Sequence, residues 1–356
     1  MYVVNGRAER RGYSSSEAAI VSVELARRAW DEMSTWPGYA PTPLRTLPDW
    51  AAELGLAEVL YKDEASRFGL GSFKALGGAY AAKLLIEKAL ATGIGSRPLH
   101  LCCATDGNHG RSVAFAAQRR GLACTVFMHE AAPVDKASAI KALGASVIRT
   151  PGAYDDSVRA AKQTAEREGW LLVADTTEDP DDETPANVMQ GYGVMLLEIL
   201  EQRASQPPPT HVFLQGGCGG LAAGIAGPMA QVFAQDRPRV VIVEPQAAAC
   251  LTLSAEAGRP SSATGDLRTS MEMLSCGEVS IAAWNILERR ADAFMTISDA
   301  DAEGVARELN AQGLSVGVSG AAGLAGLRTA CGNGDIRASL NLSPTSCVWV
   351  FGTEGA

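Results

Sequence analysis

Lys74 stands in a setting that is unusual for a solvated charge. It follows a Gly-Ser-Phe turn at 71–73 and opens a small-residue run that predicts a helix over 76–91. The positive end of a helix disfavours an ammonium group, which predicts a lowered pKa for Lys74. A lysine of this kind is a nucleophilic amine suited to a Schiff base with an aldehyde. An ordinary lysine extended toward solvent fits the segment equally well.

A glycine-rich turn follows the predicted strand His211–Leu214 and precedes a small-residue helix. Its sequence is Gly216, Gly217, Cys218, Gly219, Gly220. Consecutive backbone N–H groups in such a turn can bind a phosphate, although glycine-rich turns also serve helix packing. The spacing is not that of the dinucleotide-binding motif, and the lysine of an ATP-binding loop is missing.

A second turn carries three chemically useful side chains. It leaves the predicted strand 98–104 and comprises Thr105, Asp106, Gly107, Asn108 and His109 before Gly110, with a helix expected over 111–120. Its backbone amides could bind a carboxylate, Asn108 could donate a hydrogen bond and Asp106 could act as a base. Alternatively, Asp106 is a helix N-cap and His109 a surface group.

Two further polar residues follow predicted strands. Asp175 follows 170–174, and Thr353 follows the last strand, 346–351. Ligands of α/β proteins bind at the carboxyl ends of strands, which makes both residues candidates for a site. Taken singly, each is equally well a turn or strand-end residue. The acidic residues at 178–183 indicate a solvated loop.

Strands and helices alternate at short spacing through most of the chain. This alternation predicts an α/β protein with a parallel sheet and helices on both faces. Before it, we expect one helix over Ser15–Met33. The proline run at 207–209 is a plausible domain boundary.

Composition narrows the classes of partner. The 356 residues are 47% hydrophobic and 20% charged, with a net charge of −9, which argues against nucleic acid and anionic membranes. No apolar run is long enough to span a membrane, and the first residues lack the apolar core of a signal peptide, so we expect a cytoplasmic protein. Eight cysteines without CxxC spacing and only four histidines predict no metal site.

Several stretches together resemble one family. They are RFGLGSFKALGGAYA (67–81), ATDGNHGRSVAFAA (104–117), MQGYG (189–193), the glycine-rich turn, VEP (243–245), SCGEVS with AWNIL (275–287) and GTEG (352–355). The chain resembles the pyridoxal-phosphate enzymes of fold type II and, within them, the diaminopropionate ammonia-lyases. Asp106 narrows the resemblance, because related dehydratases usually have serine there.

The resemblance implies a fold and a cofactor. The fold would be α/β, of the tryptophan synthase β-like type, with two three-layer α/β domains. A large domain, 1–77 and 198–356, would bind pyridoxal 5′-phosphate, and a small domain, 78–197, would close over the substrate. Lys74 would bind the cofactor aldehyde and Phe73 would lie beside it. Residues 216–220 would bind the phosphate, Asn108 the phenolic oxygen and Thr353 the pyridine nitrogen.

The resemblance also implies a reaction. It is α,β-elimination of 2,3-diaminopropionate to aminoacrylate and ammonia, followed by hydrolysis to pyruvate and a second ammonia. Asp106 would act as a base on one face of the substrate, and Lys74 and Asp175 on the other. Thr105, Asp106, Gly107 and His109 would contact the amino acid, and the enzyme would be a homodimer.

Alternatives share much of this pattern. A β-replacement synthase, or a paralogue acting on another β-substituted amino acid, would carry the same cofactor residues. The cysteine at 218 and the acidic loop after Asp175 depart from the family pattern. A ligand-binding relative without activity is a further alternative, although the intact Lys74 argues against it.

Overall fold

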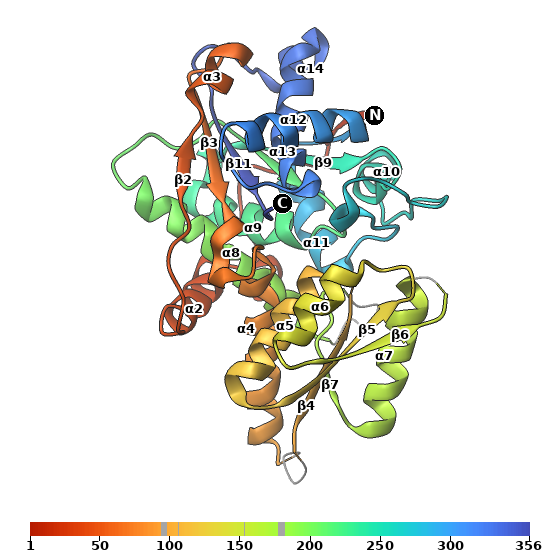
Figure 1. The fold of residues 1–356 in the computed structure, drawn as a ribbon. Helices are drawn as coiled ribbons and strands as arrows, with labels where there is room; N and C mark the ends of the chain where they lie inside the picture. Colours follow the sequence, from red (N-terminus) through yellow and green to blue (C-terminus); the bar gives the residue numbers. More distant parts are fainter. Residues whose placement is uncertain (94–97, 106, 153, 177–181) are drawn as a thin grey trace. The chain divides into compact units, whose positions relative to one another are not determined.

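The computed structural model describes residues 1–93, 98–105, 107–152, 154–176 and 182–356 (Figure 1). Within these ranges the chain divides into unit 1, which comprises Met1–Phe73 and Tyr192–Ala356, and unit 2, which comprises Lys74–Gly191. Both boundaries lie a few residues before the predicted ones. The proline run at 207–209 was expected near a boundary but lies inside unit 1. Asp106 and residues 178–181 of the acidic loop lie outside the described residues.

Unit 1 is built on a mostly parallel sheet of seven described strands. These are β1 (Tyr2–Val4), β2 (Leu44–Thr46), β3 (Glu58–Asp63), β8 (His211–Gln215), β9 (Arg239–Pro245), β10 (Ala293–Ile297) and β11 (Cys347–Gly352). Their order is β1-β10-β9-β8-β11-β3-β2, and only the edge strands β1 and β2 are antiparallel to their neighbours. The carboxyl ends of β8, β9 and β11 therefore meet at one edge of the sheet.

Helices cover both faces of this sheet. They are α1 (Ser15–Ile20), α2 (Val23–Met33), α3 (Pro48–Leu54), α9 (Gly220–Phe233), α10 (Cys250–Ala257), α11 (Ile281–Arg290), α12 (Asp299–Ala311), α13 (Val318–Gly332) and α14 (Gly334–Leu340). A further helix, α8 (Thr184–Gln202), begins in unit 2 and continues into unit 1. Across the described ranges, no helix combines the length and apolarity needed to cross a bilayer.

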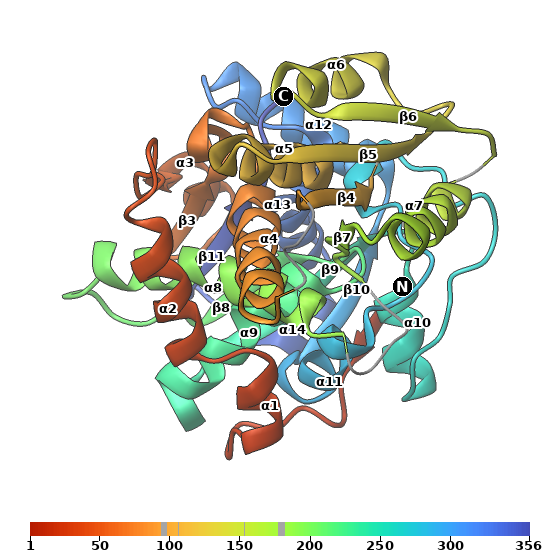
Figure 2. The same ribbon diagram turned by 90° about the horizontal axis from the view of Figure 1, so that it is seen from below.

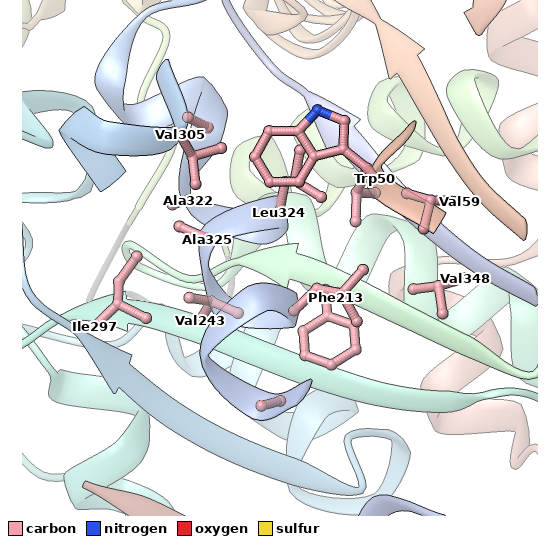
Figure 3. Close-up of a cluster of buried hydrophobic side chains, with 14 of the residues drawn as sticks. Trp50, Val59, Phe213, Val243, Ile297, Val305, Ala322, Leu324, Ala325 and Val348 are labelled. Carbon is pink, nitrogen blue, oxygen red and sulfur yellow. The ribbon is translucent and has the colours of Figure 1, made fainter. Parts of the chain in front are cut away.

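Helix α13 packs directly on the middle of the sheet (Figure 3). Its glycines permit this approach, since a Cβ atom on Gly323 would lie 3.0 Å from the carbonyl oxygen of Phe213 in β8. The Phe213 side chain belongs to the same apolar cluster as this helix. Val212 and Leu214 are also fully buried and, because side chains alternate along a strand, point to the opposite face. There α9 contacts β8, so unit 1 has three layers.

Unit 2 is a smaller α/β unit. Its elements are α4 (Lys74–Ala91), β4 (His100–Ala104), α5 (Asn108–Arg120), β5 (Ala123–His129), α6 (Val134–Ala142), β6 (Ser146–Thr150), α7 (Tyr154–Glu168) and β7 (Leu171–Leu172). The four described strands are parallel in the order β6-β5-β4-β7, as Figure 2 shows.

Two adjacent residues of β5 show that this sheet is also covered on both faces. Phe127 packs against Ala161 and Ala165 of α7. Val126 points the other way, toward Gly110 of α5. Figure 1 shows α7 on one side of the sheet and α5 and α6 on the other. The predicted α/β architecture is confirmed.

The N-terminal prediction is wrong in one respect. The single helix expected over Ser15–Met33 is broken at Val21 and Ser22, where the backbone is extended. Ser22 accepts a hydrogen bond from the backbone of Leu25 and caps α2, as Ser14 caps α1 with Glu17. The serine at 22 was the signal for a second helix start.

Candidate functional site

Lys74 is the first residue of α4, and the fold brings it to Asp175. Lys74 Nζ lies 2.8 Å from Asp175 Oδ2, although the residues are 101 positions apart. Burial alone would raise the pKa of Asp175, but the Lys74 ammonium holds it well below its usual range. The Asp175 carboxylate in turn stabilises the ammonium form of Lys74. This opposes the effect predicted from the helix end alone.

His109 approaches the same carboxylate oxygen as Lys74. Its Nε2 is 2.9 Å from the carbonyl oxygen of Val173, and its Nδ1 is 3.9 Å from Asp175 Oδ2. The side chain is buried, so the interpretation of His109 as a surface group is wrong. Burial lowers the pKa of His109, which keeps the imidazole neutral at physiological pH.

The turn between β4 and α5 is held by its own backbone and side chains. Gly107 N–H donates to Thr105 Oγ1 at 3.0 Å, and Thr105 N–H donates to Phe127 O at 3.1 Å. Gly107 is the N-cap of α5, which begins at Asn108 and not at Arg111 as predicted. Thr105 and Asn108 are buried at this end of the strand. Asp106, the predicted base, lies outside the described residues.

Close helix packing fixes the start of α4. A Cβ atom on Gly191 of α8 would overlap the carbonyl oxygen of Leu76, two residues after Lys74. A Cβ atom on Gly78 would overlap the hydroxyl of Ser112 in α5. Both glycines let neighbouring helices approach α4 closely, so the segment that carries Lys74 has little freedom to shift.

In unit 1 the glycine-rich turn joins β8 to α9. Gly217 and Gly219 have φ angles of +59° and +100°, a region that favours glycine. Gly216 N–H donates to Val243 O of β9 and Gly219 N–H to Gly216 O, so one amide serves the sheet and the other the turn. The N-cap of α9, Gly219, offers no side chain to the first turn of the helix. An anion at this end would therefore replace the missing cap.

Sequence reasoning missed a carboxylate behind this turn. Glu244 is fully buried, and Gly216 lies against it so closely that a Cβ atom there would overlap the Glu244 side chain. The carboxylate accepts hydrogen bonds from Leu251 N, Thr252 N and Thr252 Oγ1, and so caps α10. Burial raises the pKa of Glu244 to about 7. The VEP motif (243–245) contained this residue but gave no sign of its contacts.

Thr353 follows β11, whose carboxyl end shares a sheet edge with that of β8. Thr353 is buried, and its carbonyl oxygen accepts from Phe73 N–H at 3.1 Å. The backbones of Glu354 and Ser72 form an isolated antiparallel β-bridge, so the segment after β11 pairs with the turn before Lys74. The Phe73 ring packs 4.6 Å from that of Tyr192. The candidate residues thus form two sets, one in each unit.

This chain is similar to known proteins in sequence and in fold. A family model described as "Pyridoxal-phosphate dependent enzyme" matches residues 35–344. The chain belongs to this family. It is 36% identical over 370 residues to diaminopropionate ammonia-lyase of Escherichia coli (strain K12), covering 98% of this chain and 92% of that one. To diaminopropionate ammonia-lyase of Salmonella typhimurium (strain LT2) it is 39% identical over 282 residues, covering 74% and 70%.

A solved structure of a diaminopropionate ammonia-lyase is also similar to this chain in three dimensions. The crystal structure of the E. coli diaminopropionate ammonia-lyase in complex with an aminoacrylate-PLP azomethine reaction intermediate has a TM-score of 0.91 to this chain at 34% identity. The match covers 100% of this chain and 93% of the other. The predicted fold type II and the predicted cofactor, pyridoxal phosphate, are confirmed.

The residues of this pyridoxal-phosphate enzyme fit its cofactor. The glycine-rich turn offers backbone amides at an uncapped helix start, which suits a phosphate. Lys74 is partly exposed, with 24% of its side chain accessible, which suits an amine that must reach an aldehyde. Thr353 ends a strand at the same sheet edge as the phosphate turn.

Proposed function

We propose that this protein is a pyridoxal-phosphate-dependent lyase that eliminates ammonia from 2,3-diaminopropionate. The products are pyruvate and two molecules of ammonia, because aminoacrylate hydrolyses after release. The Lys74–Asp175 pair, within a chain that is similar to diaminopropionate ammonia-lyases along nearly its whole length, carries the proposal.

The bound cofactor supplies an electron sink for the substrate's α-carbon. Lys74 would hold the cofactor through its aldehyde, and Asp175, 2.8 Å from Nζ, would orient the amine. The backbone amides of Gly217, Cys218 and Gly220, at the start of α9, would hold its phosphate. Asn108 and Thr353 would hold the ring, at its phenolic oxygen and at its nitrogen respectively.

The elimination needs a base at the α-carbon and an acid at the leaving group, since ammonia leaves well only when protonated. Asp106 removes the proton on one face of the substrate, and Lys74, oriented by Asp175, on the other. The negative charge of Asp106 also attracts the distal ammonium of diaminopropionate and disfavours serine, which carries a neutral hydroxyl.

The direct test measures products from purified holoenzyme. D- and L-2,3-diaminopropionate are supplied separately, with serine and threonine as controls, and pyruvate and ammonia are quantified. We expect two ammonias per pyruvate and a much higher rate with diaminopropionate than with serine. Asp106→Ser should lower the rate with diaminopropionate and relatively favour serine.

A different outcome would favour the β-replacement synthase. If the cofactor absorbance changes on addition of substrate but no pyruvate appears, the lyase proposal fails. Product analysis with added nucleophiles would then identify the second substrate. Unchanged kinetics of Asp106→Ser with both substrates would remove Asp106 from its assigned role.

We further propose a cytoplasmic homodimer. All eight cysteines lie among the described residues and are free thiols, which suits a reducing compartment. The dimer rests on the family resemblance. Sedimentation equilibrium of the holoenzyme tests it directly, and a monomer at micromolar concentration would contradict it.

A further inference from the structure

His109 is a buried group to which the proposed reaction assigns no proton. Its Nε2 lies 2.9 Å from Val173 O. Because a carbonyl oxygen only accepts hydrogen bonds, Nε2 must carry the proton. Burial lowers the pKa of His109 and keeps the ring neutral, so Nδ1 presents a lone pair.

That lone pair is left unused inside the protein. Among the described residues Nδ1 has no hydrogen-bond partner, and Asp175 Oδ2, at 3.9 Å, lies beyond hydrogen-bond distance. Two acceptors face each other across this gap. A proton on Nδ1 would convert the approach into a charge-assisted hydrogen bond. The ring lies close to α4, since a Cβ atom on Gly78 would lie 3.2 Å from Nδ1.

The charged groups that act on His109 come from two segments. Asp175, in the segment after β7, raises the pKa of His109, and Lys74, at the start of α4, lowers it. On β4 the Cys103 thiol is neutral, because burial raises its pKa well above the usual value. The protonation of His109 therefore depends on whether Lys74 still carries its charge.

We propose that His109 is a positioning residue that takes up, at Nδ1, the proton that Lys74 releases before its amine bonds to pyridoxal phosphate. Asp175 Oδ2 lies within 4 Å of both nitrogens, 2.8 Å from Lys74 Nζ and 3.9 Å from His109 Nδ1. One proton leaves Lys74 Nζ and one arrives at His109 Nδ1, while Asp175 keeps its charge. An ammonium–carboxylate pair becomes an imidazolium–carboxylate pair, so the partly buried carboxylate always has a cation beside it. The inference rests on the proposed role of Lys74 and holds for any amino-acid substrate.

The first test needs no cofactor. Lys74→Met keeps an apolar stem but removes the charge, and NMR of the histidine ring nitrogens follows protonation against pH. His109→Gln, which loses the signals of this ring, assigns them among the four histidines. In Lys74→Met we expect the His109 titration to move upward by about 1–3 pH units. Equal titration in the variant and the original protein would overturn the inference. Lys74→Ala serves if Lys74→Met does not fold.

The second test follows cofactor uptake. In His109→Gln the amide nitrogen can still donate to Val173 O, but the titratable Nδ1 is lost. Visible absorbance reports the bond between apoprotein and pyridoxal phosphate as a function of pH. We expect the uptake rate to fall ~10-fold at neutral pH and to recover at high pH. His100→Gln is the control, since His100 stacks on Trp170 in the same unit, away from Asp175.

The pH profile separates the possible results. A profile unchanged from the original protein, or a loss that is equal at every pH, would show that His109 acts only through packing. Hydride reduction and peptide mapping identify the lysine that bears the cofactor. A label on another lysine would overturn the role of Lys74 in the proposed function, whereas the NMR titration tests the coupling of His109 to Lys74 without the cofactor.

Discussion

At the scale of single residues, the pairing of Lys74 with Asp175 is the central feature of the site. The sequence identified both residues as candidates but could not identify the contact, because 101 positions separate them. It equally could not show that His109 is buried beside them. Such contacts depend on where α4, α5 and the segment after β7 lie in unit 2, which local sequence does not encode.

Removal of the charge at Asp175 should impair the reaction without unfolding the protein. Asp175→Asn keeps the shape of the side chain but removes the negative charge that orients the Lys74 amine. We expect the rate of pyruvate formation to fall by roughly 10²-fold. Asp135→Asn, at an exposed position of α6, is the matched control and should react at the original rate. Equal rates for both variants would contradict the role of Asp175.

Glu244 should make stability depend on pH in an unusual direction. Burial raises its pKa from 4.5 to about 7, so between these values the folded state retains a proton that the unfolded chain releases. Its contribution is complete below pH 4.5 and is lost as pH rises to about 7. The unfolding free energy relative to Glu244→Gln should fall by up to about 3 kcal/mol over this range. Urea titrations at several pH values measure it, and a constant difference would contradict the raised pKa.

At the scale of elements, sequence periodicity predicted most of the strands and helices correctly. It failed where a short polar signal interrupts a pattern, as at Ser22, and where an element is brief. The predicted strand over 170–174 shortens to Leu171–Leu172. The short helices α3, α10 and α14 were not predicted, because one or two turns leave too little periodicity to recognise.

Close packing between α8 and α4 should be sensitive to a single methyl group. In Gly191→Ala the new Cβ would overlap the backbone of Leu76, so α4 must shift together with Lys74. We expect a loss of about 1–3 kcal/mol in unfolding free energy and weaker cofactor binding. Gly304→Ala is the control, since only the flexible Arg307 guanidinium lies near, at 3.9 Å. It should be neutral or stabilising by up to about 1 kcal/mol. Indistinguishable behaviour of the two variants would contradict this packing argument.

At the scale of the whole molecule, binding of the cofactor should stabilise the folded protein against unfolding. Pyridoxal phosphate at 100 times its dissociation constant should raise the unfolding free energy by about 2.7 kcal/mol. Pyridoxal lacks the phosphate, so it cannot make the proposed contact with the start of α9. At equal concentration it should stabilise the protein less, as thermal unfolding would show. Equal stabilisation by the two compounds would argue against phosphate binding at 216–220.

The place of β11 in the sheet has a consequence for biosynthesis. This strand, Cys347–Gly352, lies between β8 and β3, so a segment translated after the other described strands of the sheet fills the middle of the sheet of unit 1. Unit 2 is continuous, from Lys74 to Gly191, and all of its sequence leaves the ribosome much earlier. In the nascent chain, unit 2 would therefore fold first. The edge of β3 that pairs with β11 would stay unpaired until β11 is translated. On ribosomes stalled before residue 347, unit 2 would already be folded, whereas the sheet of unit 1 would lack β11. The unpaired strand edges of that sheet would be binding sites for chaperones.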